Sequence, residues 1–127
     1  MSRPPPSWPQ PPDAVPHGWL EDVPSGARIT VAGLVLVRQR PGTASGVIFL
    51  TLEDETGVAN VVVWNTVFEQ YRRAVVAGRL LRVTGKLERK DGVTHVLAEV
   101  IEDASPLLDR LADPGFGAPV DGSEGDA

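Results

Sequence analysis

The sequence predicts an all-β domain, a five-stranded Greek-key barrel with one helix between its third and fourth strands, flanked by disordered ends. Three observations predict this architecture. Short apolar runs alternate with turn residues between residues 25 and 104, which is typical of all-β proteins. After residue 64, and only there, the spacing of apolar residues changes from every second residue towards every 3.6 residues, which indicates one short helix. Eight of the 12 prolines lie within residues 1–24, where they disfavour regular structure.

The first strand is predicted over residues 28–38. It contains Gly33, where the missing side chain permits a bulge or a sharp bend. A flexible loop over residues 42–46 follows. The second strand, residues 47–53, alternates in polarity, and its core face is formed by Ile48, Leu50 and Leu52.

The third strand, residues 58–64, follows a tight turn. The Asp54 side chain can bond the nearby backbone, and Gly57 accepts a positive φ, so both favour a hairpin. The predicted helix then begins with a capping box formed by Thr66 and Glu69 and ends at Gly78, with Phe68, Tyr71 and Val75 on its buried side.

Two further strands complete the barrel, over residues 79–87 and 93–101, with a polar turn over 88–92. Ser105 and Pro106 then begin a short helix. The chain therefore divides into a Pro-rich flexible arm (1–24), a barrel domain (25–104), and a short helix with an acidic, Gly-rich, disordered tail (105–127). We expect the arm to form neither helix nor sheet ladder, although Trp19 and Leu20 provide apolar side chains that favour folding back onto the barrel.

The net charge of −5 is unevenly distributed along the chain. Residues 27–103 contain ten Lys or Arg and nine Asp or Glu residues, a net charge of +1, so the acidity belongs to the ends. The absence of cysteine excludes disulfides and thiolate metal sites and favours a reducing compartment. The longest apolar run, residues 31–37, is far shorter than the roughly 18 residues of a membrane span. No signal peptide is visible, and we expect a cytoplasmic protein without membrane association.

The predicted order of elements matches the OB-fold barrel, which has a bent first strand and a helix between its third and fourth strands. An SH3-like barrel is the main alternative, but it lacks a helix of this length at that position. In the OB-fold the helix plugs one open end of the barrel, so Phe68 and Tyr71 are expected to be partly buried.

The same residues resemble the OB domain near the C-terminus of bacterial DNA polymerase III alpha chains, and most of all the error-prone, DnaE-like branch. The resemblance spans about residues 27–108, with matching motifs at 31–35 (VAGLV), 38–42 (RQRPG), 49–57 (FLTLEDETG) and 62–64 (VVW). The polymerase and phosphoesterase regions of those chains are absent from this sequence. The resemblance therefore implies a single-stranded nucleic-acid-binding OB module and gives no support for polymerase activity.

Two aromatic residues are the leading candidates for contacts with bases. OB domains bind single strands by stacking bases on exposed aromatic rings beside basic groove walls. Phe49 and Trp64 fall on the outward face of the second and third strands when Leu50 faces inward. Thr51 and Asn60 are weaker candidates on the same face. The alternative is that the arm, the C-terminal helix or a partner chain covers this face.

Basic residues at the predicted rims are the candidates for phosphate contacts. Arg38 and Arg40 are favoured as functional, whereas Arg89 and Lys90 are better explained as a solvated turn, because acidic neighbours cancel much of their field. Further candidates on the fourth strand are Arg82 and Lys86.

No motif in the sequence indicates catalysis, a metal ion or a cofactor. Glu53, Asp54 and Glu55 are consecutive, so their side chains alternate in direction and a turn explains them better than a metal site. His95 has no matching ligand, because the other histidine lies in the arm. Neither a Walker motif nor a nucleophile elbow is present. We therefore expect a binding module rather than an enzyme.

Our first hypothesis is a module that binds single-stranded DNA, or RNA, with little sequence specificity in replication or repair. The second is a protein-interaction OB module that docks on an error-prone polymerase or mutagenesis partner without binding nucleic acid, which the near-zero charge of the barrel supports. A third is an inactive remnant of a longer polymerase. The sequence leaves both monomer and dimer open.

Overall fold

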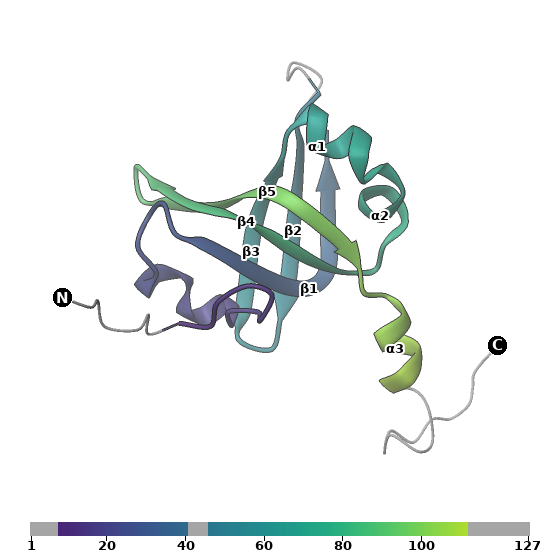
Figure 1. The fold of residues 1–127 in the computed structure, drawn as a ribbon, viewed down its shortest axis with the longest axis horizontal. Helices are drawn as coiled ribbons and strands as arrows, with labels where there is room; N and C mark the ends of the chain where they lie inside the picture. The colour runs from purple at the N-terminus through teal and green to yellow at the C-terminus, as the bar shows by residue number, and fades with distance from the viewer. Residues whose placement is uncertain (1–7, 41–45, 112–127) are drawn as a thin grey trace.

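The computed structural model of the chain describes residues 8–40 and 46–111, and within them five strands close into a barrel (Figure 1). Around the barrel the strands follow the order β1-β2-β3-β5-β4. All paired strands are antiparallel except β3 and β5, which run parallel. This arrangement confirms the predicted Greek-key OB architecture. The bounds are β1 Arg28–Gln39, β2 Ile48–Asp54, β3 Gly57–Val63, β4 Leu80–Lys90 and β5 Val93–Asp103.

Strand β1 closes the barrel because it pairs with two strands. Residues 28–34 pair with β4, and residues 34–39 pair with β2. The bend between these halves requires Gly33, since a Cβ atom there would lie 2.6 Å from the carbonyl oxygen of Glu53. The bend at Gly33 is as predicted, and a bulge follows it, where the register with β2 shifts between Val35 and Val37.

The core is formed by the alternating inward side chains of the strands, as the period of two predicts. Leu50 and Leu52 of β2 are almost fully buried. They belong to one core cluster with the inward residues of the other four strands, which are also buried: Ile29, Val31, Val61, Val63, Leu81, Val83, Leu87 and Val96.

Two short helices, α1 (Asn65–Gln70) and α2 (Arg72–Ala77), lie between β3 and β4 and cover one end of the barrel (Figure 1). The sequence predicts one helix, but Tyr71 interrupts it with φ −120° and ψ 30°. The predicted capping box is wrong: Trp64 is the N-cap and makes no side-chain cap bond, and Glu69 pairs with Arg72 instead. Phe68 is buried as the plug of the barrel end, as predicted.

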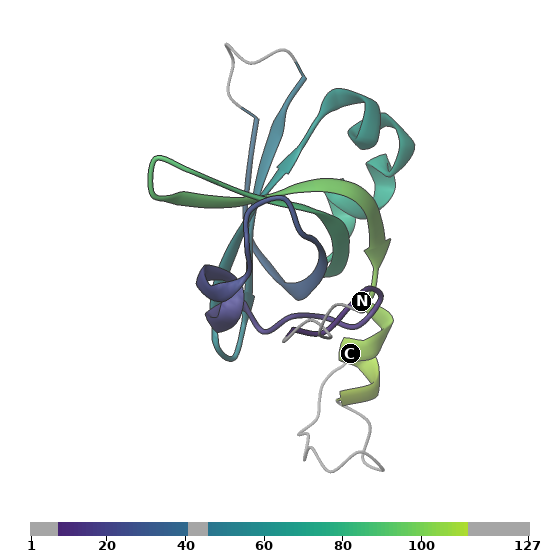
Figure 2. The same ribbon diagram turned by 60° about the vertical axis from the view of Figure 1, so that its left-hand side comes forward.

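Part of the segment predicted to be a flexible arm folds onto the barrel (Figure 2). A 3-10 helix, η1, spans His17–Asp22, and the Val15 N–H donates to the carbonyl of Thr30 at 2.8 Å, on an edge of β1. The prediction that the arm forms no helix and no sheet ladder is therefore wrong for these residues. Pro16 and Pro24 flank η1 and do not interrupt it, and apolar side chains of the segment complete the core. Val15, Leu20 and Val23 are buried. Residues 1–7 lie outside the described part.

The β4–β5 hairpin is longer than predicted. The sequence predicts a turn at Glu88, Arg89 and Lys90, but these residues continue β4. The turn is only Asp91 and Gly92, with φ of 56° and 78°. Two successive positive φ values match the tight turns that favour an Asp-Gly pair. After β5 the predicted short helix is present as α3, Pro106–Leu111. The predicted loop residues 42–45 and the tail from 112 onwards lie outside the described residues.

Candidate nucleic-acid interface

The outer faces of β1, β2 and β3 form one continuous surface, which we call the outer sheet face. The strand register sets its side chains in three rows across the sheet. Because alternate residues of a strand point the same way, these rows share one side of the barrel. The rows are Gln39–Phe49–Val62, Val37–Thr51–Asn60 and Leu34–Glu53–Val58, and Trp64 follows the end of β3.

The outer sheet face mixes apolar and polar side chains, including the carboxylate of Glu53, and apart from buried Val62 it is largely uncovered within the described residues. Trp64 is 53% exposed, and Val37 and Val58 are also exposed. Phe49 and Thr51 are half-buried, and Asn60, directly opposite Thr51, is exposed. Neither the N-terminal segment nor α3 buries Trp64. This face therefore combines the predicted aromatic residues with the two predicted polar ones.

The basic candidates are not gathered on this face. Arg38 donates through Nε to the carbonyl of Val75 at 2.7 Å and through a terminal nitrogen to the carbonyl of Gly78. These bonds satisfy carbonyl groups at the C-terminal end of α2, which have no partner within the helix. The Arg38 side chain therefore ties the end of β1 to α2.

Arg89 is engaged in a second structural contact. Its guanidinium donates to the carbonyls of Leu20 at 2.7 Å and Val23 at 2.9 Å, and to the Thr94 hydroxyl at 3.2 Å. Glu21 lies 3.6 Å away. Arg89 thus holds η1 against the β4–β5 hairpin, while its neighbour Lys90 stays exposed.

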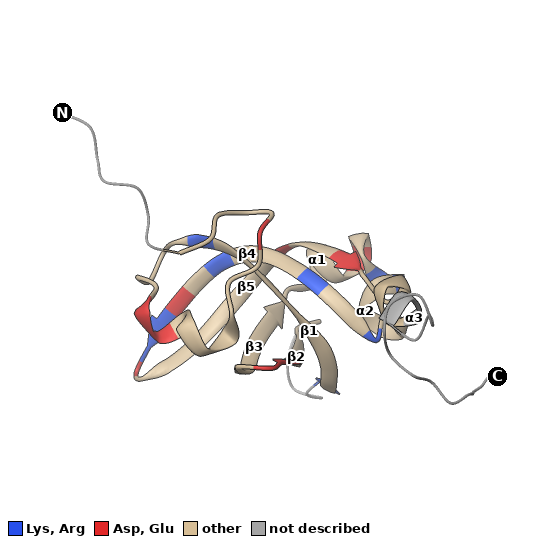
Figure 3. Ribbon diagram, turned by 90° about the horizontal axis from the view of Figure 1, so that it is seen from below, with Lys and Arg blue, Asp and Glu red and all other residues tan. Residues whose placement is uncertain are grey.

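Two further basic candidates, Arg82 and Lys86, lie on β4, which is not adjacent to β2 or β3 in the barrel. Arg82 is paired with Glu102 at 3.0 Å, and Lys86 is exposed. Basic and acidic positions follow one another along β4 towards its turn (Figure 3). The structure therefore separates Arg82 and Lys86 from Phe49 and Trp64.

A pocket at the end of the barrel brings the predicted residues Arg38 and Arg40 together with Arg72, which the sequence analysis missed. It has a volume of about 320 Å³ and lies between the ends of β1 and β2 and the helices α1 and α2. The guanidinium carbons of Arg40 and Arg72 each lie 4.7 Å from the centroid of the Phe68 ring. The spacing of four residues between Phe68 and Arg72 on a predicted helix was the signal that could have revealed this contact. We call this the Phe68 pocket; its lining includes Arg38, Arg40, Ile48, Phe68, Arg72 and Val75.

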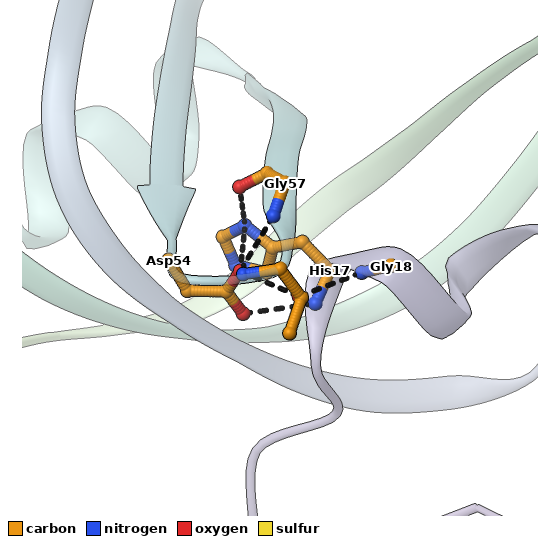
Figure 4. A network of polar contacts seen from close by, with 5 residues as sticks. His17, Gly18, Asp54 and Gly57 are labelled. Atoms are coloured by element: carbon orange, nitrogen blue, oxygen red, sulfur yellow. Dashed lines mark hydrogen bonds and ion pairs between the residues drawn. The ribbon is translucent and has the colours of Figure 1, made fainter.

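Asp54 organises the β2–β3 turn and joins it to η1 (Figure 4). One carboxylate oxygen accepts hydrogen bonds from the N–H groups of Thr56 and Gly57 and from the Thr56 hydroxyl, and the other accepts from the His17 N–H at 2.9 Å. Burial raises the pKa of Asp54, but these hydrogen bonds outweigh it, so its pKa lies below the ordinary value. Glu53 and Asp54 end β2 and Glu55 begins the turn, so these three consecutive side chains are placed by the hairpin. Among the described residues no group of three or more His, Asp or Glu side chains is placed to hold a metal ion.

Comparison with known proteins identifies the family. Residues 29–104 match the OB-fold nucleic acid binding domain family. The chain belongs to this family. The chain is 59% identical over 114 residues to an error-prone DNA polymerase of Ruegeria pomeroyi, and 56% identical over 87 residues to error-prone DNA polymerase 1 of Rhizobium meliloti. These matches cover 90% and 68% of this chain but only 10% and 8% of the polymerases.

A solved structure shares the same architecture. The asparaginyl-tRNA synthetase of Pyrococcus horikoshii superimposes with a TM-score of 0.54 at 29% identity, over 63% of this chain and 19% of the synthetase. The family match begins at Ile29, after η1. The contacts of Arg89 and Asp54 with residues 17–23 therefore join the OB-fold domain to a segment outside the matched part. No helix in the described residues has the length and apolar character needed to cross a membrane.

Proposed function

We propose that this OB-fold domain binds single-stranded DNA along the outer sheet face, as a module associated with replication or repair. The observation that carries the proposal is the uncovered position of Trp64 beside half-buried Phe49 on one face of the barrel. Flat aromatic rings bind any base through its π-face, so recognition has little sequence specificity. The proposed activity is binding rather than catalysis.

Stacking supplies most of the binding energy in this proposal. Base-aromatic stacking is worth about 1–3 kcal/mol per base. Arg38 and Arg89 donate hydrogen bonds within the chain, which leaves Arg40 as the predicted rim residue beside the face that makes no ion pair among the described residues. Asn60 borders a pocket of about 320 Å³ beside η1 and is available to bond a base edge.

The choice of DNA is supported by the error-prone DNA polymerases that this chain resembles. The resemblance to an asparaginyl-tRNA synthetase makes RNA the competing strand. The chain spans about a tenth of those polymerases, so the proposal takes from them the context of replication or repair and does not assign their activity or partners to this chain.

Fluorescence anisotropy of a labelled oligo-dT, titrated with wild-type protein and with Trp64→Ala, tests the proposal. Loss of one stacking ring should weaken binding by between about fivefold and a hundredfold. Trp19→Ala is a matched control, since Trp19 is 48% exposed but lines a different pocket, with Trp8. Equal affinity of the two variants would contradict the proposal, and an oligo-U arm compares RNA with DNA.

A second candidate function is docking of a partner protein on the same face. The observation that favours it is the group of exposed aliphatic side chains Leu34, Val37 and Val58 on this face, with exposed Leu36 at the bulge of β1. An apolar protein interface does not depend steeply on salt, whereas phosphate contacts do. Strand binding that is absent even at low salt would favour this second function.

A further inference from the structure

The Phe68 pocket lies one helical turn from Trp64. Trp64 is the N-cap of α1, and its carbonyl accepts a hydrogen bond from the N–H of Phe68 at 2.8 Å. Ile48, which lines the pocket, pairs with Val63 immediately before Trp64. Trp64 and the pocket therefore lie at the same end of the barrel, where the backbone of a strand stacked on Trp64 can extend towards the pocket.

Three guanidinium groups line the pocket, and they differ in the hydrogen bonds and ion pairs that they already make within the chain. Arg38 bonds the carbonyls of Val75 and Gly78. Arg72 is paired with Glu69 at 2.6 Å. Arg40 makes no hydrogen bond or ion pair with any described residue and is held only by its contact with the Phe68 ring. The pocket therefore carries three positive charges against one facing carboxylate.

The arrangement suits an anion with several oxygen acceptors. A guanidinium lying over an aromatic ring is held in position, while its N–H groups remain available around its edge. Apolar walls from Ile48, Val75 and Val76 reduce solvent screening of the charges. Phosphate oxygens accept parallel hydrogen bonds from a guanidinium fork.

We infer that the Phe68 pocket is a phosphate subsite, which receives the phosphate next to the base stacked on Trp64. This inference rests on the proposed function. Its central contacts come from Arg40 and Arg72, and Glu69 competes with the phosphate for Arg72. The phosphate is either an internal phosphodiester or a terminal phosphate, and the two are distinguished by comparing otherwise identical oligo-dT strands with a 5′-phosphate, a 3′-phosphate or neither.

The test measures affinity and its salt dependence for Arg40→Gln and Arg72→Gln. Each should weaken binding about threefold at low salt, and the two together should reduce the slope of log K against log salt by about 0.7, the value of one phosphate on a single strand. Arg28→Gln is the matched control: Arg28 and Arg72 side chains are both 57% exposed and both ion-paired, but Arg28 lies at the start of β1 and pairs with Glu99 of β5. It should bind like wild type.

Glu69→Gln provides a test by gain of affinity that impaired folding cannot imitate. Removal of this carboxylate frees Arg72, so binding should tighten about twofold, whereas Glu99→Gln should leave affinity unchanged. A circular-dichroism melt of each variant checks that it folds.

Three outcomes are decisive. Weakened Arg40 and Arg72 variants together with a tightened Glu69 variant support the subsite. If all of them bind like wild type while Trp64→Ala still loses affinity, the subsite is wrong and the proposed function stands. If wild type binds none of the strands, both fall; binding of acidic peptides instead would assign the pocket to a protein ligand.

Discussion

Asp54 shows how one side chain can hold two distant segments together. Its carboxylate accepts four hydrogen bonds, three within the β2–β3 turn and one from His17 in the N-terminal segment. Hydrogen bonds to a charged acceptor are stronger than those between neutral groups. This residue therefore contributes to the stability of both the turn and η1.

The stability of the protein should depend on the ionisation of Asp54. Its pKa in the folded state is lowered, so its contribution is present above the ordinary value near 3.8 and is lost as pH falls through the folded pKa. Asp54→Asn should lower the free energy of unfolding at pH 7 by about 1–2 kcal/mol and make the acid-induced loss of stability shallower. Urea denaturation at pH 7 and pH 3 measures both effects.

Glu55→Gln is the control for this prediction, because Glu55 is an exposed neighbour in the same turn. It should change neither value. An Asp54→Asn protein as stable as wild type at pH 7 would contradict the role given to the carboxylate.

At the residue scale, the sequence predicts which way a side chain points better than which group it bonds. The outward position of Trp64 and the inward positions of Leu50 and Leu52 follow from a period of two residues. The contacts of Arg38 and Arg89 do not, since their carbonyl acceptors lie 37 to 69 positions away along the chain. No local pattern distinguishes an arginine at a solvated rim from one that bonds a distant carbonyl.

At the element scale, η1 is an integral part of the barrel core. Leu20 is 5% exposed within the hydrophobic core, while its neighbour Trp19 is exposed. Arg89 bonds the backbone of this segment at two carbonyls. The segment thus adds buried apolar surface that residues 25–104 alone do not supply.

Leu20→Ala should lower the free energy of unfolding by about 2–5 kcal/mol, the range for buried leucines. Trp19→Ala should cost less than about 1 kcal/mol, because this side chain is already half exposed. Chemical denaturation of the two neighbouring variants measures the difference. Similar costs for both would show that η1 does not contribute to the core as described.

The boundaries of elements were harder to predict than their types. All five strands and the C-terminal helix are present, because alternating apolar residues and turn residues report them locally. The charged residues Glu88–Lys90 resemble a turn, yet they continue β4 because pairing with β5 satisfies their backbone groups. The edge pairing of the N-terminal segment with Thr30 is non-local, and the prolines conceal it.

At the scale of the whole molecule, the barrel separates two kinds of surface. The outer sheet face carries aromatic and aliphatic side chains with Glu53 as the one charged residue of its rows, whereas β4 carries mixed charges. The order of elements predicts this barrel, because a helix between the third and fourth strands is characteristic of the OB-fold. The Phe68 pocket was not predicted, since it forms only where the ends of β1 and β2 meet α1 and α2.

The salt dependence of strand binding should be shallow for an OB-fold domain. With few arginines free beside the outer sheet face, we expect only about two or three phosphate contacts, and thus a slope of log K against log salt between about −1.4 and −2.1. Titrations at four salt concentrations measure it. A slope steeper than about −4 would show that a larger basic surface, and not stacking on the aromatic face, dominates binding.

Mapping of the bound strand by NMR tests the central claim most directly. Addition of oligo-dT to the isotopically labelled protein should shift the Trp64 indole signal and the amide signals of Thr51 and Asn60. The amides of Arg82 and Lys86 on β4 should remain in place. Shifts confined to β4, or no shifts at saturating strand concentration, would contradict the assignment of the outer sheet face as the binding surface.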